Sequence, residues 1–228
     1  MIFFKRFVIP LLLLLTSQAF ARGVQGYVST TYADGDFRLS WGSSAADVYV
    51  SDAENVAVRN VASLFAEDVE RVTGQKPAVK NRVEGLSRCA VIVGTLDKCP
   101  VIEGLVKAGK IDVREVRGKW ETFLIQVVAN PLPGVDVGLV VVGSDRRGAI
   151  YGLFDISENM GVSPWYWFAD VQPMKQQALV VKKGAYRQGP PSVKYRGIFI
   201  NDEMWGIRPW ASQTYAPEEG QGLGPKTY

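Results

Sequence analysis

The chain of 228 residues contains no histidine. Imidazole is the side chain that most often serves as a general base near neutral pH, and it is a frequent ligand of zinc. Its absence removes the usual general base of enzyme sites and argues against a zinc centre. Acid–base chemistry would then depend mainly on the 23 aspartates and glutamates.

Cysteine is scarce, with only Cys89 and Cys99 in the chain. Cys89 opens the apolar run CAVIVG, and Cys99 lies in the loop after it. A strand of about six residues covers roughly 20 Å, whereas the Cα atoms of a disulfide lie within about 7 Å of each other. A bridge would require the loop to double back. We therefore expect two free thiols, with a disulfide as the alternative.

The first 21 residues predict a secretory signal. MIFFKR supplies a basic start, and FVIPLLLLL is apolar but far shorter than the roughly 20 residues that span a bilayer. Ala19-Phe20-Ala21 fits the small-x-small pattern before a cleavage site. A buried core helix is the alternative, and Pro10 argues against it. We expect cleavage after Ala21 and a secreted or periplasmic mature protein.

Charge is nearly balanced once the signal is removed. Cleavage takes away Lys5 and Arg6, so 26 − 2 = 24 basic residues face 23 acidic ones, and the net charge falls from +3 to +1. A near-neutral protein has no basic stripe with which to hold nucleic acid. We expect neither a nucleic-acid partner nor a membrane span in the mature chain.

Strand-like and helix-like patterns alternate through residues 22–188. A helix is expected from an N-cap at Asp52 to Thr73, closed by Gly74, because its apolar residues recur every three or four positions. Further helices are expected over Pro100–Ala108 and from Ser144 or Asp145 to Met160. The expected strands are Ala46–Ser51, Cys89–Thr95, Trp120–Val128, Val137–Ser144 and Ala178–Tyr186. Interleaved buried strands and helices predict a layered α/β domain with a mixed sheet.

Aromatic residues gather in SPWYWFADV, residues 163–171. Trp165, Tyr166 and Trp167 are typical of a platform that stacks on sugar rings. A hinge packed between two domains explains the same residues equally well, and the sequence leaves both interpretations open.

A stiff linker, RQGPPS at residues 187–192, excludes both helix and central strand. We place the boundary there, with the linker and a second domain over residues 189–228. VKYRGIFI (193–200) predicts a buried strand that ends at Asn201-Asp202-Glu203. In a (β/α)8 barrel, catalytic and binding residues project from this end of a strand. The alternative is a solvated strand end.

The residues after this strand suit sugar recognition. Carboxylates bind hydroxyl groups or transfer protons, and Trp205 or Trp210 can stack on a pyranose face. Neighbours on a strand point to opposite sides, so at most one of Asp202 and Glu203 would contact a substrate. Arg208 matches a uronic acid carboxylate in geometry, although most surface arginines are only solvated. Arg196 is interpreted as structural.

The stretch VKYRGIFINDEMWGIRPWASQTYAPEEGQGLGPKTY resembles the start of the catalytic barrel in glycoside hydrolase family 115, the xylan α-glucuronidases. VIVGTLDKCPVIEGLVKAGKID, GKWETFLIQVV, NPLPGV and GSDRRGAIYGLFDISENMGVSPWYWFADV are similar, in order, to its N-terminal accessory domain. The resemblance implies an inverting hydrolase that removes α-1,2-linked glucuronic acid, or its 4-O-methyl ether, from glucuronoxylan. It implies no metal or organic cofactor.

The resemblance carries over Asp202 and Glu203 as substrate-binding residues, with Asn201 and Trp205 behind them, and leaves the general acid and base unassigned. A barrel needs about 250 residues, and only residues 193–228 follow the linker. We therefore expect a fragment or truncated product of such an enzyme, inactive alone. A homodimer is expected only of the full-length enzyme.

Two other readings compete with this one. The first is a non-catalytic exported module that binds glycan or protein through residues 165–167 and the tail. The second is another glycosidase with a similar accessory domain, such as a hexosaminidase, which RGIFINDE followed by GPKTY disfavours.

Overall fold

The computed structural model describes residues 26–166, 170–201 and 203–220. The chain divides into two units, residues 1–190 and 191–228. The predicted signal (1–21), Trp167, Asp202 and the closing GPKTY lie outside the described residues. The two units are described separately below.

A six-stranded mixed sheet forms the centre of the first unit, in the order β10-β7-β8-β6-β4-β5. β6 lies between two parallel neighbours, β8 and β4, while β7 pairs antiparallel with β8 and with β10. The strands are β4 (Asp47–Val50), β5 (Val79–Lys80), β6 (Cys89–Thr95), β7 (Phe123–Leu132), β8 (Val135–Gly143) and β10 (Ala185–Gln188). The predicted layered α/β class is confirmed.

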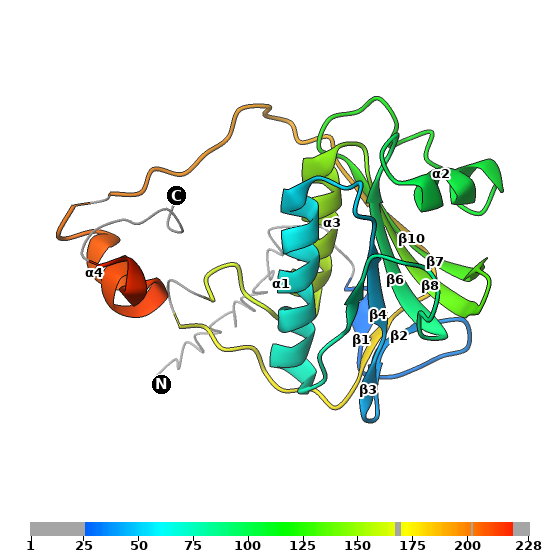
Figure 1. Ribbon diagram of the computed structural model, residues 1–228, viewed down its shortest axis with the longest axis horizontal. Helices are drawn as coiled ribbons and strands as arrows, with labels where there is room; N and C mark the ends of the chain where they lie inside the picture. The colour runs from blue at the N-terminus through cyan, green and yellow to red at the C-terminus, as the bar shows by residue number, and fades with distance from the viewer. Residues whose placement is uncertain (1–25, 167–169, 202, 221–228) are drawn as a thin grey trace, which may run out of the picture. The chain divides into compact units, whose positions relative to one another are not determined.

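Helices cover both faces of this sheet (Figure 1). Helices α1 (Val56–Thr73) and α3 (Arg146–Asn159) lie side by side on one face, and α2 (Pro100–Lys107) lies on the other. β6 contributes alternately to the two cores: Val91 and Val93 face α1 and α3, whereas Ile92 belongs to the cluster with α2. Burial on both faces explains the continuous apolar run in its sequence.

A second, antiparallel sheet adds to the α1–α3 core. Its order is β1-β9-β2-β3, with β1 (Val28–Ser29), β2 (Phe37–Trp41), β3 (Ser44–Ala45) and β9 (Leu179–Val181). Phe37 and Leu179 from this sheet, and Tyr27 just before β1, are buried in the same core as the two helices. The sheet joins the start of the unit to its end.

In the first unit, two predicted elements differ most from the structure. Helix α1 begins at Val56 because Asn55, not Asp52, is the N-cap: its side chain accepts a hydrogen bond from the Ala57 amide at 3.0 Å. The preceding turn buries Glu54, which binds the amide and hydroxyl of Thr95 at 2.7 and 3.0 Å. This tertiary contact is not visible in local sequence.

The predicted single strand over Ala178–Tyr186 is wrong. Leu179–Val181 forms β9 in the small sheet, and Ala185–Gln188 forms β10 in the large one. Gly184, with φ of 147°, lies between them, and this region of φ is open chiefly to glycine. The chain changes sheets at this point.

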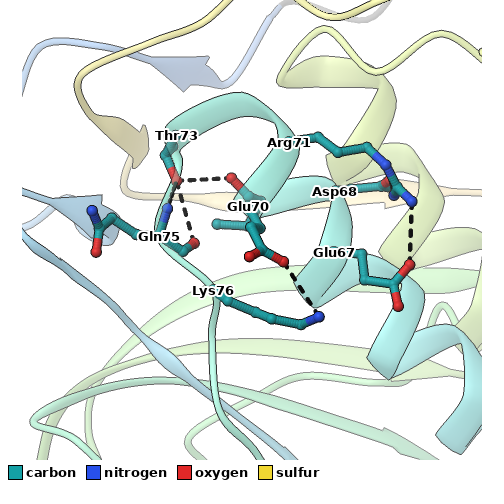
Figure 2. A network of polar contacts seen from close by, with 8 residues as sticks. Glu67, Asp68, Glu70, Arg71, Thr73, Gln75 and Lys76 are labelled. Carbon is teal, nitrogen blue, oxygen red and sulfur yellow. Dashed lines mark hydrogen bonds and ion pairs between the residues drawn. The ribbon is translucent and has the colours of Figure 1, made fainter.

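The end of α1 carries a polar network, shown in Figure 2. Gly74 closes the helix in the left-handed conformation, and its amide reaches the Glu70 carbonyl at 2.7 Å. Arg71 binds Asp68 at 2.8 Å and Glu67 at 3.2 Å. Burial raises the pKa of the Asp68 carboxyl, and the charge and hydrogen bond of Arg71 oppose that shift. The predicted helix end is confirmed.

Both cysteines carry free thiols, as expected. Cys99 is fully buried after β6, and Cys89 is partly buried at the start of that strand. Burial raises the pKa of each thiol. The neutral, less reactive form is therefore favoured at both positions.

The second unit does not contain the predicted strand. Residues 193–200 have no regular secondary structure, and the side chains of Ile198 and Phe199 are 78% and 92% exposed. A strand needs a neighbour for its backbone hydrogen bonds, and among the described residues of this unit none provides one. The apolar pattern specifies a strand only where such a partner exists.

Short helical turns make up the remainder of the second unit. These are α4 (Arg208–Trp210), a π-helical turn (Ala211–Tyr215) and a 3-10 turn (Pro217–Glu219). Among the residues that the structure describes in both units, no helix is both long enough and apolar enough to cross a bilayer.

Candidate functional site

The candidate site is a tight turn over residues 201–207. The Asn201 side-chain oxygen accepts a hydrogen bond from the Glu203 amide at 2.9 Å. The Asn201 carbonyl accepts one from Ile207 at 3.0 Å, and the Glu203 carbonyl accepts one from Gly206 at 2.9 Å. Asn201 therefore caps the turn, as asparagine side chains commonly do.

Glycine is required at position 206 by the closeness of the backbone. A Cβ atom added to Gly206 would lie 1.9 Å from the Asn201 carbonyl oxygen. No side chain fits at that distance, so the turn depends on the pair Asn201 and Gly206. The sequence N-D-E-M-W-G thus specifies a loop in which both ends are fixed.

The turn presents its side chains to solvent. Glu203 is exposed, and Trp205 is 95% exposed. Asp202 lies outside the described residues. The prediction that only one of the two carboxylates faces a substrate assumed a strand, and the structure places Glu203 in a turn instead. The alternation of side chains along a strand therefore does not predict which way the Glu203 side chain points.

Trp210 and Arg208 lie just after the turn. The Trp210 ring stacks on Tyr215 with centroids 4.9 Å apart, so one of its faces is covered within the unit. Arg208 is exposed. Arg196 donates to the Val193 carbonyl at 2.6 Å, a local contact that suits its structural interpretation. Trp205 is the more accessible of the two tryptophans considered for stacking.

The aromatic segment of the first unit is partly engaged in packing. The Arg71 guanidinium lies 5.0 Å from the Tyr166 ring centroid, which ties this segment to α1. Trp165 remains 61% exposed. Trp167 lies outside the described residues. In the described part of this segment Tyr166 contacts Arg71 and Trp165 faces solvent, so the choice between a sugar-stacking platform and a hinge stays open.

One exposed aromatic group was missed by the sequence analysis. It consists of Tyr32, Arg38 and Trp41 and is called the Arg38 cluster below. The Arg38 Cζ atom lies 4.1 Å from the Tyr32 ring centroid and 5.4 Å from that of Trp41. The sequence signal was weak, because the three residues are spaced irregularly along β2 and the loop before it.

Possible metal ligands are dispersed in the part of the chain that the structure describes. In residues 26–166, 170–201 and 203–220, no group of three or more cysteine, aspartate or glutamate side chains is arranged to hold an ion. The turn instead offers a carboxylate, an amide and an indole, which are groups that bind hydroxyls and the apolar face of a sugar.

Comparison with known proteins gives a consistent result. Residues 188–228 match glycosyl hydrolase family 115. The structure is similar to that of a family 115 4-O-methyl-α-glucuronidase with specificity for decorated arabinogalactans, at 34% identity and a TM-score of 0.68. The match covers 84% of this chain and 23% of that one. No curated protein sequence matches significantly.

More distant similarity extends to hexosaminidases. A family 20 β-N-acetylhexosaminidase from Streptomyces coelicolor A3(2) is 14% identical, with a TM-score of 0.38 over 68% of this chain and 24% of that one. The N-acetyl-β-hexosaminidase of Streptomyces plicatus is also 14% identical, with a TM-score of 0.35 over 66% and 22% of the two chains. Similarity at this level says nothing about function.

Proposed function

The chain belongs to glycoside hydrolase family 115, and we propose on that basis that it is the N-terminal portion of an exported α-glucuronidase. The observation that carries the proposal is 34% identity to a solved 4-O-methyl-α-glucuronidase over 84% of this chain. The reaction proposed is hydrolytic removal of α-1,2-linked glucuronic acid, or its 4-O-methyl ether, from a plant polysaccharide by inversion.

Two polysaccharides are candidates for the substrate. The motifs RGIFINDE and GPKTY resemble those of xylan α-glucuronidases, which favours glucuronoxylan. The solved relative has specificity for decorated arabinogalactans, which favours that class instead. The proposed pocket would recognise the uronic acid itself, so the same pocket chemistry would serve either polymer. We take glucuronoxylan as the first substrate to test.

The turn over residues 201–207 is proposed as one wall of the sugar pocket. Glu203, and Asp202 beside it, would bind substrate hydroxyls, and the exposed Trp205 would stack on a sugar ring. Asn201 would act by holding the turn, since its side-chain oxygen accepts from the Glu203 amide. An inverting site needs two carboxyl groups about 6.5–9.5 Å apart. No acid or base is assigned to this turn.

The isolated chain is proposed to be inactive. Barrel active sites are assembled from the ends of several strands, and the described residues of the second unit contain no strand. The chain spans 23% of the length of its solved relative. Binding energy from one turn alone would not position a substrate for attack by water.

The test compares two purified proteins on two polymers. One is the 228-residue chain, and the other is the product of the reading frame continued 3′ of codon 228. Release of 4-O-methylglucuronic acid from glucuronoxylan and from decorated arabinogalactan is followed by ion chromatography. We expect release only by the longer product. Release by the short chain would contradict its inactivity, and no release by the longer product would contradict the function.

A pair of variants of the longer product tests the turn. Glu203→Gln should raise KM or lower kcat by at least about tenfold, equivalent to about 1.4 kcal/mol. Glu84→Gln, at an exposed position of the first unit, is the matched control and should not change the rate. Equal rates for both variants would remove Glu203 from the proposed pocket.

Export is part of the same proposal. Expression with the native start and N-terminal sequencing of the mature protein should give Arg22 as the first residue. An intact Met1 in cells that export proteins normally would contradict cleavage after Ala21.

A further inference from the structure

The Arg38 cluster owes its geometry to an irregularity in β2. Arg38 pairs with Val180 and Ser40 pairs with Leu179, so Leu39 is an extra residue in the strand. Regular alternation would place Arg38 and Trp41 on opposite faces. The bulge shifts the alternation by one residue, and Arg38 and Trp41 are both exposed while Leu39 and Ser40 are buried.

The two rings of the cluster are partly exposed to solvent. Tyr32 is 38% and Trp41 is 42% exposed, and their centroids lie 6.0 Å apart at an interplanar angle of 67°. An exposed pair at a fixed angle offers apolar faces and polar edges, the combination that stacks on a pyranose.

The N–H donors of the Arg38 guanidinium remain available for hydrogen bonds. Arg38 lies over the face of Tyr32, with 4.1 Å between Cζ and the ring centroid. Stacking covers the face of a guanidinium and leaves its five N–H donors at the rim. Among the residues that the structure describes, none forms an ion pair with Arg38. The guanidinium therefore contacts the Tyr32 ring and is available to an anion.

We propose that the Arg38 cluster is a binding site for a polysaccharide that carries uronic acids. Trp41 and Tyr32 would contact sugar rings, and the Arg38 guanidinium would bind a carboxylate in bidentate fashion. The site lies in the first unit and shares no residue with the turn at residues 201–207. The proposal goes beyond hydrolysis and rests on the proposed function only for the choice of glycan.

The site would hold the protein on its polymer rather than react with it. A weak surface site raises the local concentration of substrate near any pocket carried by the same chain. A neutral glycan and an acidic glycan differ in charge, and only the acidic glycan has a carboxylate that the Arg38 guanidinium would bind. The two cases therefore predict different responses to removal of the carboxyl groups.

The experiment measures equilibrium binding by the 228-residue chain, which is expected to release no sugar. Probes are glucuronoxylan and the same polymer after reduction of its carboxyl groups, compared by affinity electrophoresis and calorimetry. Trp41→Ala should weaken binding to both polymers by about tenfold. Arg38→Gln should weaken binding to glucuronoxylan by about fivefold and leave binding to the reduced polymer unchanged.

Matched controls separate the site from general surface effects. Trp165→Ala removes another exposed tryptophan, and Arg114→Gln removes an exposed arginine that pairs with Asp112 at 2.6 Å. Both should bind like the original chain. Arg38→Lys keeps the charge but not the planar fork, and it should bind glucuronoxylan less tightly than the original chain. Thermal melting of every variant confirms that the first unit still folds.

Three results would overturn the proposal. One is no binding of glucuronoxylan by the unaltered chain, and another is equal binding by Trp41→Ala. The third is equal affinity of the original chain for native and reduced polymers, because it would assign the cluster to neutral sugars. Failure of the hydrolysis assay leaves this outcome unaffected, since binding is measured without turnover.

Discussion

Tyr27 donates a hydrogen bond to Asp155 across 128 positions of sequence, with 2.7 Å between the phenol oxygen and Oδ2. Both groups are buried, and Tyr27 also stacks on Tyr186 with centroids 4.3 Å apart. The bond connects the residue before β1 to helix α3. It gives a buried carboxylate a donor inside the core that the small sheet shares with α1 and α3.

Replacing Tyr27 with phenylalanine should destabilise the first unit. The change keeps the ring and removes the donor, leaving Asp155 with less compensation for its burial, at a cost of about 1–3 kcal/mol. Each kcal/mol lowers Tm by about 2–4 °C in a protein of this size. Thermal melting at pH 7 measures the effect. Tyr32→Phe, on the surface, is the control, and an equal Tm for both variants would contradict the role of this bond.

The same tyrosine predicts an alkaline limit to stability. Burial, followed by the charge of Asp155, raises the pKa of Tyr27 above its ordinary value near 10. Because the folded pKa exceeds the unfolded one, the stabilisation is fully present below about pH 10 and is lost as the pH rises further. The Tm should therefore fall above pH 10, and it should fall less steeply in Tyr27→Phe. Parallel curves would contradict this assignment.

Gly148 is predicted to tolerate no side chain. A Cβ atom there would lie 2.3 Å from the Thr122 carbonyl oxygen, a backbone atom. Gly148→Ala should cost at least about 1–3 kcal/mol by overpacking. Gly104→Ala in α2, where a Cβ meets nothing within 4 Å, should instead stabilise by about 0.5–1 kcal/mol. Urea unfolding of the two variants should shift in opposite directions, and a shared direction would contradict the packing argument.

Most of the elements of the first unit follow from sequence, because their patterns are local. β6 was expected from its continuous apolar run, the end of α1 from Gly74, and α3 from a cap at Ser144 or Asp145, of which the structure has Asp145. The errors have distant causes. Glu54 turns inward to bind Thr95, and residues 179–188 divide between two sheets because their partners lie far away in sequence.

The sequence predicted which residues make up the candidate site, but it did not predict their backbone conformation. N-D-E-M-W-G contains turn formers, yet the preceding run VKYRGIFI predicts a strand that has no partner among the described residues of its unit. The Arg38 cluster was not predictable, because it depends on a bulge at Leu39 that alternation alone does not reveal. Both cases show that strand patterns specify side-chain direction only when pairing is known.

The two thiols should differ in reactivity. Cys99 is fully buried and Cys89 is partly exposed, and burial raises the pKa of each thiol. A thiol-specific reagent at pH 8 should label Cys89 slowly, faster as the pH rises, and should label Cys99 only as fast as the protein opens. In the Cys89→Ser variant, only the labelling rate of Cys99 is measured. A mass lower by two hydrogens without reductant would instead show a disulfide.

Deleting residues 191–228 should leave the first unit folded. Both large hydrophobic clusters consist of residues from Tyr27 to Tyr186, so the deletion should change Tm by less than about 2 °C, equivalent to less than about 1 kcal/mol. It also removes the exposed Ile198 and Phe199. Binding of a hydrophobic dye should therefore decrease, and Phe199→Ser in the whole chain is the control. Unfolding on deletion would contradict the independence of the unit.

The partners of β9 have a consequence for biosynthesis. β1 and β2 both pair with β9, so Val28 and Phe37 meet Val181 only after some 140 to 150 intervening residues have left the ribosome. The six-stranded sheet can begin to assemble earlier, around the parallel strands β4, β6 and β8. Until β9 has been synthesised, β2 lacks this partner, and the apolar side chains of Phe37 and Leu39 stay exposed.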